Sequence, residues 1–185
     1  MKLKYIILTV LCVFSLTAES ACIVLLHGLA RTENSMNYLQ DQLENEGYKV
    51  VNIGYPSREH AIDALAKKAI VPALQLCNAE NEINFVTHSL GGILVRYYLG
   101  KHTLPQLKHV VMLAPPNKGS EVVDTLGNFP GFELLNGDAG LQLGTGVNSI
   151  PNQLGNANFD LGIIAGSNSI NWILSSLIPG TDDGK

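Results

Sequence analysis

The sequence predicts an α/β fold in which a mostly parallel sheet carries helices on both faces. Short, continuous apolar runs such as 22–26 are typical of parallel strands that are covered on both sides. These runs alternate with stretches whose apolar residues recur at helical spacing, an alternation typical of strands joined by right-handed crossovers. The 185 residues, 46% hydrophobic and 15% charged, suffice for one packed domain.

Five segments have the composition of strands. The first is uniformly apolar and runs directly into His27 and Gly28. The second is broken at its end by Gly54 and Pro56, and two prolines stop the fourth. The expected strands are 22–26, 48–53, 83–86, 109–113 and 161–165.

Three intervening segments have helical periodicity. In the first, 34–46, apolar residues fall on one face and Gly47 closes the helix. The second begins at Ile62, and Pro72 is expected to kink or shorten it. The third follows the third strand and carries apolar residues from Ile93 onward. The segment Glu121–Pro151 has no clean period and is interpreted either as a lid over a pocket or as a long loop.

The first twenty residues have the pattern of a secretory signal peptide. Lys2 and Lys4 precede an apolar run, and the small residues Ala18 and Ser20 occupy the positions that a signal peptidase reads. A membrane anchor and a core strand are the alternatives. The run is too short to cross about 30 Å of hydrocarbon as a helix, and two lysines in front of it suit export better than a core. We expect residues 21–185 to form the mature domain, secreted or periplasmic after cleavage.

Composition also bears on redox state and partners. Cys22 and Cys77 remain in the mature chain, and export permits them to form a disulfide, although two buried, inert cysteines are the alternative. The net charge of −4 gives no basic surface of the kind that nucleic-acid binding needs. No metal-binding motif is present, so neither a metal nor a cofactor is expected. The sequence does not indicate an oligomeric state.

The segment Phe85–Gly92 carries the main chemical signal. An apolar strand leads into Ser89, and Gly91 and Gly92 follow at the start of a helix. A sharp strand-to-helix turn exposes a serine hydroxyl, and small neighbours permit the turn. Thr87 departs from the G-x-S-x-G pattern, which has glycine at that position. A serine that merely begins a helix is the alternative interpretation.

A second motif, His27-Gly28-Leu29, follows the first strand. In a parallel sheet this loop lies at the ligand-facing edge. Gly28 lets the backbone approach a substrate, and the N–H groups of Leu29 and Leu90 are candidates for an oxyanion hole. We expect His27 to support the loop through hydrogen bonds rather than to act in catalysis.

Together these motifs, with the segment 114–120 after the fourth strand, resemble secreted bacterial lipases and esterases of the α/β-hydrolase superfamily. The resemblance implies a catalytic acid in a late Asp-Gly turn, for which Asp183 is the first choice and Asp182 the second. A solvated acidic tail is the alternative there. The family order also requires a histidine after the acid, followed by a last strand and helix. None of the five histidines follows Asp183, so we expect a C-terminally truncated, inactive chain.

The resemblance implies hydrolysis of a carboxylic ester through an acyl-enzyme on Ser89. The substrate would be a small-molecule or lipid ester, with contact to lipid interfaces. A thioesterase, acyltransferase or deacylase would use the same acyl-enzyme, and a non-catalytic binding module could keep the same fold. The motifs do not distinguish these alternatives or the acyl chain length.

Overall fold

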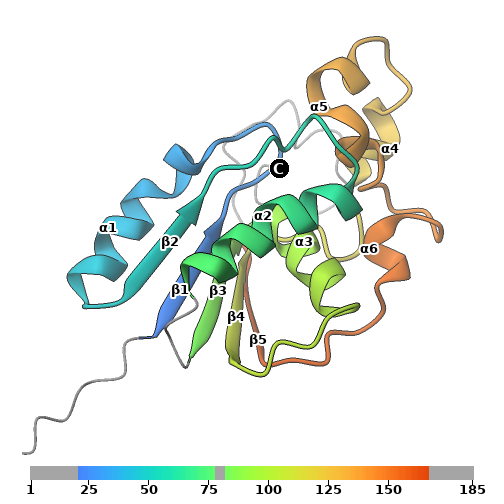
Figure 1. Cartoon of the computed structure of the whole chain (residues 1–185). Coiled ribbons are helices and arrows are strands. Elements are labelled where there is room, and N and C mark those ends of the chain that lie inside the picture. The colour runs from blue at the N-terminus through green and yellow to red at the C-terminus, as the bar shows by residue number, and fades with distance from the viewer. Residues whose placement is uncertain (1–20, 78–81, 167–185) are drawn as a thin grey trace, which may run out of the picture.

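The described residues form a sheet of five strands, all parallel, in the order β2-β1-β3-β4-β5 (Figure 1). The computed structural model describes residues 21–77 and 82–166. Parallel pairing directs the carboxyl ends of all five strands to one edge, and loops at that edge meet. This arrangement confirms the predicted fold class. The strands are β1 Cys22–Leu26, β2 Lys49–Ile53, β3 Ile83–His88, β4 Leu107–Leu113 and β5 Leu161–Ile164.

Helices cover both faces of the sheet because side chains alternate along the strands. Cys22, Val24 and Leu26 of β1 belong to the large core cluster with α2 and α3. Ile23 and Leu25 point the other way and pack with Met36 and α1. The helical segments are η1 Glu33–Met36 (a 3₁₀ turn), α1 Asn37–Asn45, α2 Ile62–Leu76, α3 Leu90–Leu99, α4 Glu121–Leu126, α5 Phe132–Leu141 and α6 Ile150–Gln153.

Of the two effects expected of Pro72, a kink or a shortened helix, the shortening is wrong, because α2 continues past Pro72 to Leu76. The hydrogen bond that a proline removes would have ended on the carbonyl four residues earlier, at Lys68. Lys68 is exposed, so water can solvate that carbonyl. The cost of the missing bond is therefore small, and the buried face of α2 keeps its packing.

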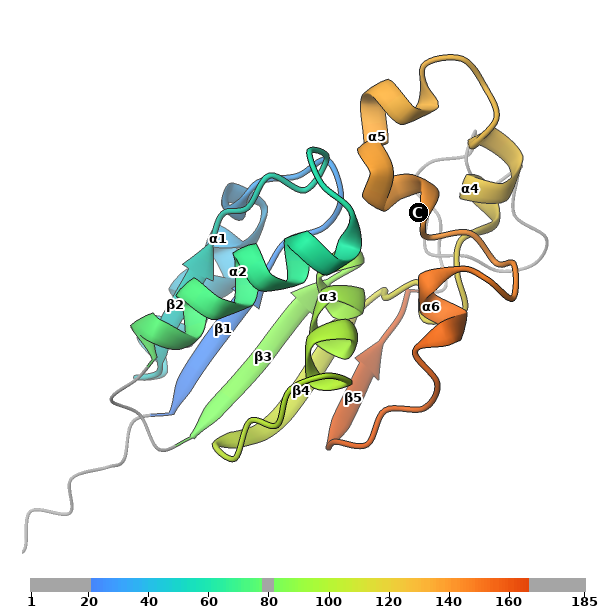
Figure 2. The same cartoon turned by 45° about the vertical axis from the view of Figure 1, so that its right-hand side comes forward.

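The segment between β4 and β5 contains helices and is not a plain loop. It contains α4, α5 and α6, and α5 is kinked at Gly137, whose φ of 64° and ψ of −174° are not helical. Figure 2 shows α4 and α5 beyond the carboxyl ends of the strands, clear of the layers that flank the sheet. We call residues 118–154 the cap. None of the helices in the described part of the chain has the length and apolar character needed to cross a bilayer.

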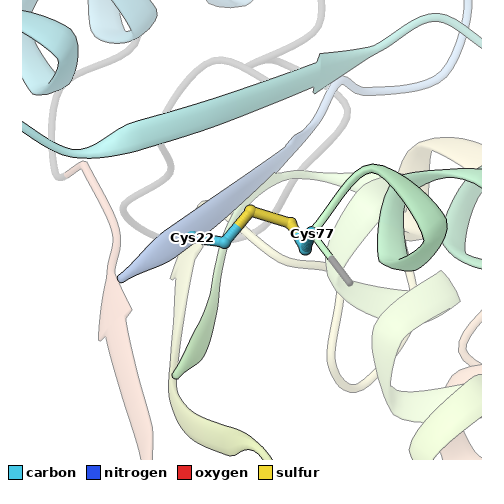
Figure 3. Close-up of a disulfide and its surroundings, with 2 residues drawn as sticks. All are labelled: Cys22 and Cys77. Carbon is cyan, nitrogen blue, oxygen red and sulfur yellow. A yellow bond between two sulfur atoms is a disulfide. The ribbon is translucent and has the colours of Figure 1, made fainter. Parts of the chain in front are cut away.

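Cys22 and Cys77 form a disulfide in the structure (Figure 3). It joins the first residue of β1 to the residue that ends α2, and their Cα atoms are 5.8 Å apart. Both residues are fully buried in the large core cluster. The disulfide therefore fixes the end of α2 against the sheet, at the edge opposite to the carboxyl ends of the strands.

Candidate active site

Ser89 lies on a sharp turn between β3 and α3. Its φ of 50° and ψ of −117° lie outside the conformations that an L-residue ordinarily adopts. The turn is fixed to the neighbouring strand β4, because the Ser89 N–H donates to the carbonyl oxygen of Leu113 at 2.9 Å. A non-glycine residue kept in such a conformation is typical of functional sites. The turn presents the serine at the carboxyl edge of the sheet, directly before the N-terminus of a helix.

The two glycines after the serine allow α3 to pack against the strands. A Cβ atom at Gly91 would lie 2.7 Å from the carbonyl oxygen of Leu26. At Gly92 it would lie 3.1 Å from the sulfur of Met112 and 3.3 Å from Cβ of Pro115. The pair therefore sets how closely the serine-bearing helix approaches the ends of β1 and β4.

Gly28 brings the second motif to the serine. A Cβ atom at Gly28 would lie 2.8 Å from Nδ1 of His88 and 3.3 Å from Cβ of Ser89. The two motifs identified in the sequence, separated by about sixty positions, are thus in contact. Leu29 follows directly, and its Cδ2 would lie 3.3 Å from a Cβ atom at Gly140 of α5. The loop after β1 is consequently enclosed between Ser89 and the cap.

His27 is buried beneath this loop and is engaged on both ring nitrogens. Its Nδ1 donates to the carbonyl oxygen of Gly28 at 2.9 Å, and its Nε2 accepts the N–H of Tyr55 at 3.4 Å. The Tyr55 ring stacks on the imidazole with centroids 4.0 Å apart, and its hydroxyl donates to the His27 carbonyl. Burial lowers the pKa of His27 below its usual value. A neutral imidazole with these partners supports the backbone of the loop.

Two residues near the site, Tyr55 and Ser57, were not identified from the sequence. Tyr55 braces His27, and the Ser57 hydroxyl accepts the N–H of Ala30, whose φ is 53°, at 3.1 Å. Both residues follow β2, whose carboxyl end lies beside that of β1. Strand order places them there, and neither residue belongs to a recognisable motif. The one signal that could have identified them is their position directly after the second strand, at the edge of the sheet where the site lies.

The remaining histidines lie elsewhere. His109 is near the start of β4, and its Nδ1 lies 2.9 Å from a carboxylate oxygen of Asp160. His102 follows α3 and packs its ring on Tyr98, with centroids 4.5 Å apart. His60 precedes α2. Among the described residues, none of these three histidines is hydrogen-bonded to Ser89. The candidate acids Asp182 and Asp183 lie outside the described residues.

The chain is similar to a family of serine esterases in sequence, and to two bacterial lipolytic enzymes in fold. Residues 17–118, more than half of the chain, match a family described as "Putative serine esterase (DUF676)". The mature lipase BlEst2 of Bacillus licheniformis superposes with a TM-score of 0.70 at 21% identity, over 90% of this chain and 77% of the lipase. Phospholipase PlaB of Legionella pneumophila gives 0.65 at 19% identity, over 84% of this chain and 41% of that protein. No curated protein sequence matches the chain.

Proposed function

The chain belongs to the DUF676 family, and on that premise we propose that it hydrolyses carboxylic esters through an acyl-enzyme on Ser89. The observation that carries this proposal is the turn at Ser89, with its φ of 50° and its contact with the loop at Gly28. A half-buried serine hydroxyl beside a helix N-terminus and a glycine loop is suited to attack on a carbonyl carbon.

The proposed reaction has two halves. The Ser89 oxygen bonds to the acyl carbon while its proton passes to a histidine base, and the ester C–O bond breaks as the alcohol takes that proton. Water then attacks the acyl-enzyme, gives its proton to the same base and releases the acid. The serine is regenerated when its oxygen recovers the proton.

Two backbone N–H groups are proposed to bind the oxyanion. Leu90 is the first residue of α3, where an N–H has no acceptor within its own helix. The helix N-terminus also places a partial positive charge beside Ser89. Leu29 supplies the second N–H from the loop that Gly28 brings against the serine. Removing one such donor typically costs about 10² to 10³ in kcat.

We propose Asp183, or otherwise Asp182, as the acid that orients the base. The base is assigned to a histidine that follows the acid, and none of the five histidines at or before His109 fits that order. His27 is excluded from this role by its burial and its two engaged nitrogens.

A lipid-like acyl ester is the proposed substrate class, and the cap supplies the supporting observation. Four large apolar side chains in the cap are mostly exposed: Phe129 63%, Leu134 85%, Leu135 62% and Val147 84%. Exposed apolar side chains of this size are suited to contact with a lipid-like acyl chain. If the substrate is of this class, emulsified long-chain esters are hydrolysed faster than soluble short-chain esters. A preference for the soluble esters would contradict it.

The test of the nucleophile is labelling with a fluorophosphonate, in which the serine oxygen bonds to phosphorus as fluoride leaves. The source DNA is first sequenced past codon 185 to define the reading frame. The protein encoded by that whole frame is then labelled. We expect the adduct on the peptide that contains Ser89, and Ser89→Ala to lose at least about 10³-fold in labelling rate. Ser35→Ala, on an exposed turn, is the control. Undiminished labelling in Ser89→Ala would contradict the proposal.

We also propose that the protein is exported, with cleavage after Ser20. Expression in a bacterial host with an intact secretory pathway should give a mature protein that begins at Ala21, as read by mass spectrometry. Ala18→Asp should block cleavage, because the peptidase accepts only small residues there. Retention of residues 1–20 in the wild-type product would contradict export by this route.

A further inference from the structure

Arg96 is a charged residue inside an otherwise apolar helix. It lies seven residues after Ser89, two helical turns along α3 and on the same side. Gly92, between them, packs on Pro115, so this side of α3 faces the chain that leaves β4. Only 9% of Arg96 is exposed. A buried guanidinium must find several acceptors, because leaving its N–H groups unpaired is costly.

Four oxygens accept hydrogen bonds from the guanidinium, and they come from two distant parts of the chain. One terminal nitrogen donates to the carbonyl and side-chain oxygens of Asn117, at 3.1 and 3.0 Å. The other donates to the carbonyl oxygens of Pro151 and Gly155, at 3.2 and 2.6 Å. Asn117 immediately precedes the cap and Gly155 immediately follows it. One side chain therefore holds both ends of the cap on the helix that begins at Ser89.

The acceptors are uncharged, which distinguishes this contact from an ion pair. Within residues 21–77 and 82–166, no carboxylate forms an ion pair with Arg96. Burial lowers the pKa of the guanidinium. Arginine suits this role because its planar fork presents several donors in fixed directions, whereas lysine presents a single nitrogen.

The cap also contacts the loop of the proposed oxyanion hole. Leu29 packs against Gly140 of α5, and the backbone N–H of Ile62 donates to the side-chain oxygen of Gln142 at 2.8 Å. Movement of the cap ends would therefore be transmitted to the space beside Leu29 and Ser89.

We propose that Arg96 is a positioning residue that holds the cap in place and thereby sets which molecules can reach Ser89. It takes no part in bond making. The proposal depends on the proposed function only in treating Ser89 as the position that a substrate must reach. It concerns the cap as a unit: both ends are fixed at one point on α3, and the middle of the cap is held by α2.

The first test is hydrogen exchange on the full chain with Arg96→Met and Arg96→Lys. We expect both variants to raise exchange rates of amides in residues 117–155 by at least about tenfold, while amides in β1 and β3 change by less than about twofold. Lysine should not restore protection, because one nitrogen cannot serve both ends. Lys101→Met is the matched control, since it removes a cation just beyond α3 whose hydrogen bond is to Tyr97.

The second test measures access to position 89 without relying on catalysis. Ser89→Cys is alkylated with a small iodoacetamide and with a bulky maleimide, and the adduct on that peptide is quantified. Combining Ser89→Cys with Arg96→Met should raise the bulky-to-small rate ratio by at least about fivefold, because the cap no longer excludes the larger reagent. Failure of the proposed function would leave this result unchanged, since the thiol needs no catalytic base.

Two results would overturn the proposal. Exchange that rises equally in the cap and in β1 and β3 would make Arg96 a general stability residue. An unchanged rate ratio at position 89 would show that the cap does not control access. Asn117→Ala provides a milder variant in case Arg96 substitutions fail to fold. It removes one acceptor, and should raise exchange at the β4 end of the cap first.

Discussion

At the scale of single residues, the site depends on the close contact between Gly28 and the serine turn. Gly28→Ala would place a Cβ atom 2.8 Å from Nδ1 of His88 and 3.3 Å from Cβ of Ser89. We expect the loop or the serine to shift by a fraction of an ångström, and labelling of Ser89 to slow by about tenfold to 10²-fold. The measurement is the fluorophosphonate labelling rate, with thermal unfolding followed in parallel.

Gly146→Ala is the control, because no atom lies within 4 Å of its added Cβ. It should label like the wild type. A normal labelling rate in Gly28→Ala would show that the loop after β1 tolerates displacement, and would weaken the assignment of Leu29 to the oxyanion hole.

His27 makes stability depend on pH. Burial lowers its pKa in the folded state, so the unfolded chain binds the proton more readily. Stability rises with pH where the unfolded state binds more protons, so the free energy of unfolding should fall as pH drops below about 6.5. Urea titrations at pH 5 and 7.5 measure the difference. The difference should shrink in His27→Gln but persist in His60→Gln, and an equal difference in His27→Gln would exclude His27 as its source.

The residues that could be predicted from the sequence are those that lie in a short, recognisable motif. Ser89 and Gly28 lie in short motifs that follow strands, and the structure brings the motifs together. His27, for which a supporting role is predicted, is hydrogen-bonded to Gly28 and Tyr55. Arg96 could not be interpreted in advance, because its acceptors lie 21 to 59 residues away along the chain.

At the scale of elements, the packing of α3 against β1 depends on Gly91. A Cβ atom there would lie 2.7 Å from the Leu26 carbonyl oxygen and 2.9 Å from Leu26 Cβ, both on a buried strand. We expect Gly91→Ala to lower the free energy of unfolding by about 1 to 3 kcal/mol, as overpacking does. Denaturant unfolding of the variant and the wild type measures this difference in the free energy of unfolding. Gly162→Ala on β5 is the control, since its Cβ would meet its nearest neighbour at 3.8 Å, and equal effects would contradict the argument.

The strands and the helices that flank the sheet could be predicted, because burial against the sheet sets the pattern of apolar residues in each of them. The helices of the cap could not be predicted, because tertiary contacts hold the cap together. Its short helices are joined by side chains such as Asp124, which accepts from the Thr145 backbone at 3.0 Å, and Asn152, which donates to the carbonyl oxygen of Thr145 at 2.8 Å. Helices this short have little stability of their own. The irregular pattern rich in glycine therefore left a lid and a long loop as alternatives, and did not indicate the short helices that the fold stabilises.

At the scale of the whole molecule, the Cys22–Cys77 disulfide joins two elements of the core that are 55 residues apart in sequence. In the chain-entropy account, a cross-link over a loop of this length stabilises the fold by about 4 kcal/mol, because it restricts the unfolded chain. The double variant Cys22→Ala/Cys77→Ala should unfold at correspondingly lower urea. The fold itself should persist, since both sites are buried among apolar side chains that alanine can also contact.

Reduction supplies the control for that prediction. Dithiothreitol should lower the unfolding midpoint of the wild type toward that of the double variant, and should leave the variant unchanged. The loss arises from the cross-link, so the m-value of the variant should differ from that of the oxidised protein, whose unfolded state exposes less surface. If the oxidised and reduced proteins unfold at the same urea concentration, the disulfide does not stabilise this fold, and the stability of the domain rests on its two core clusters alone.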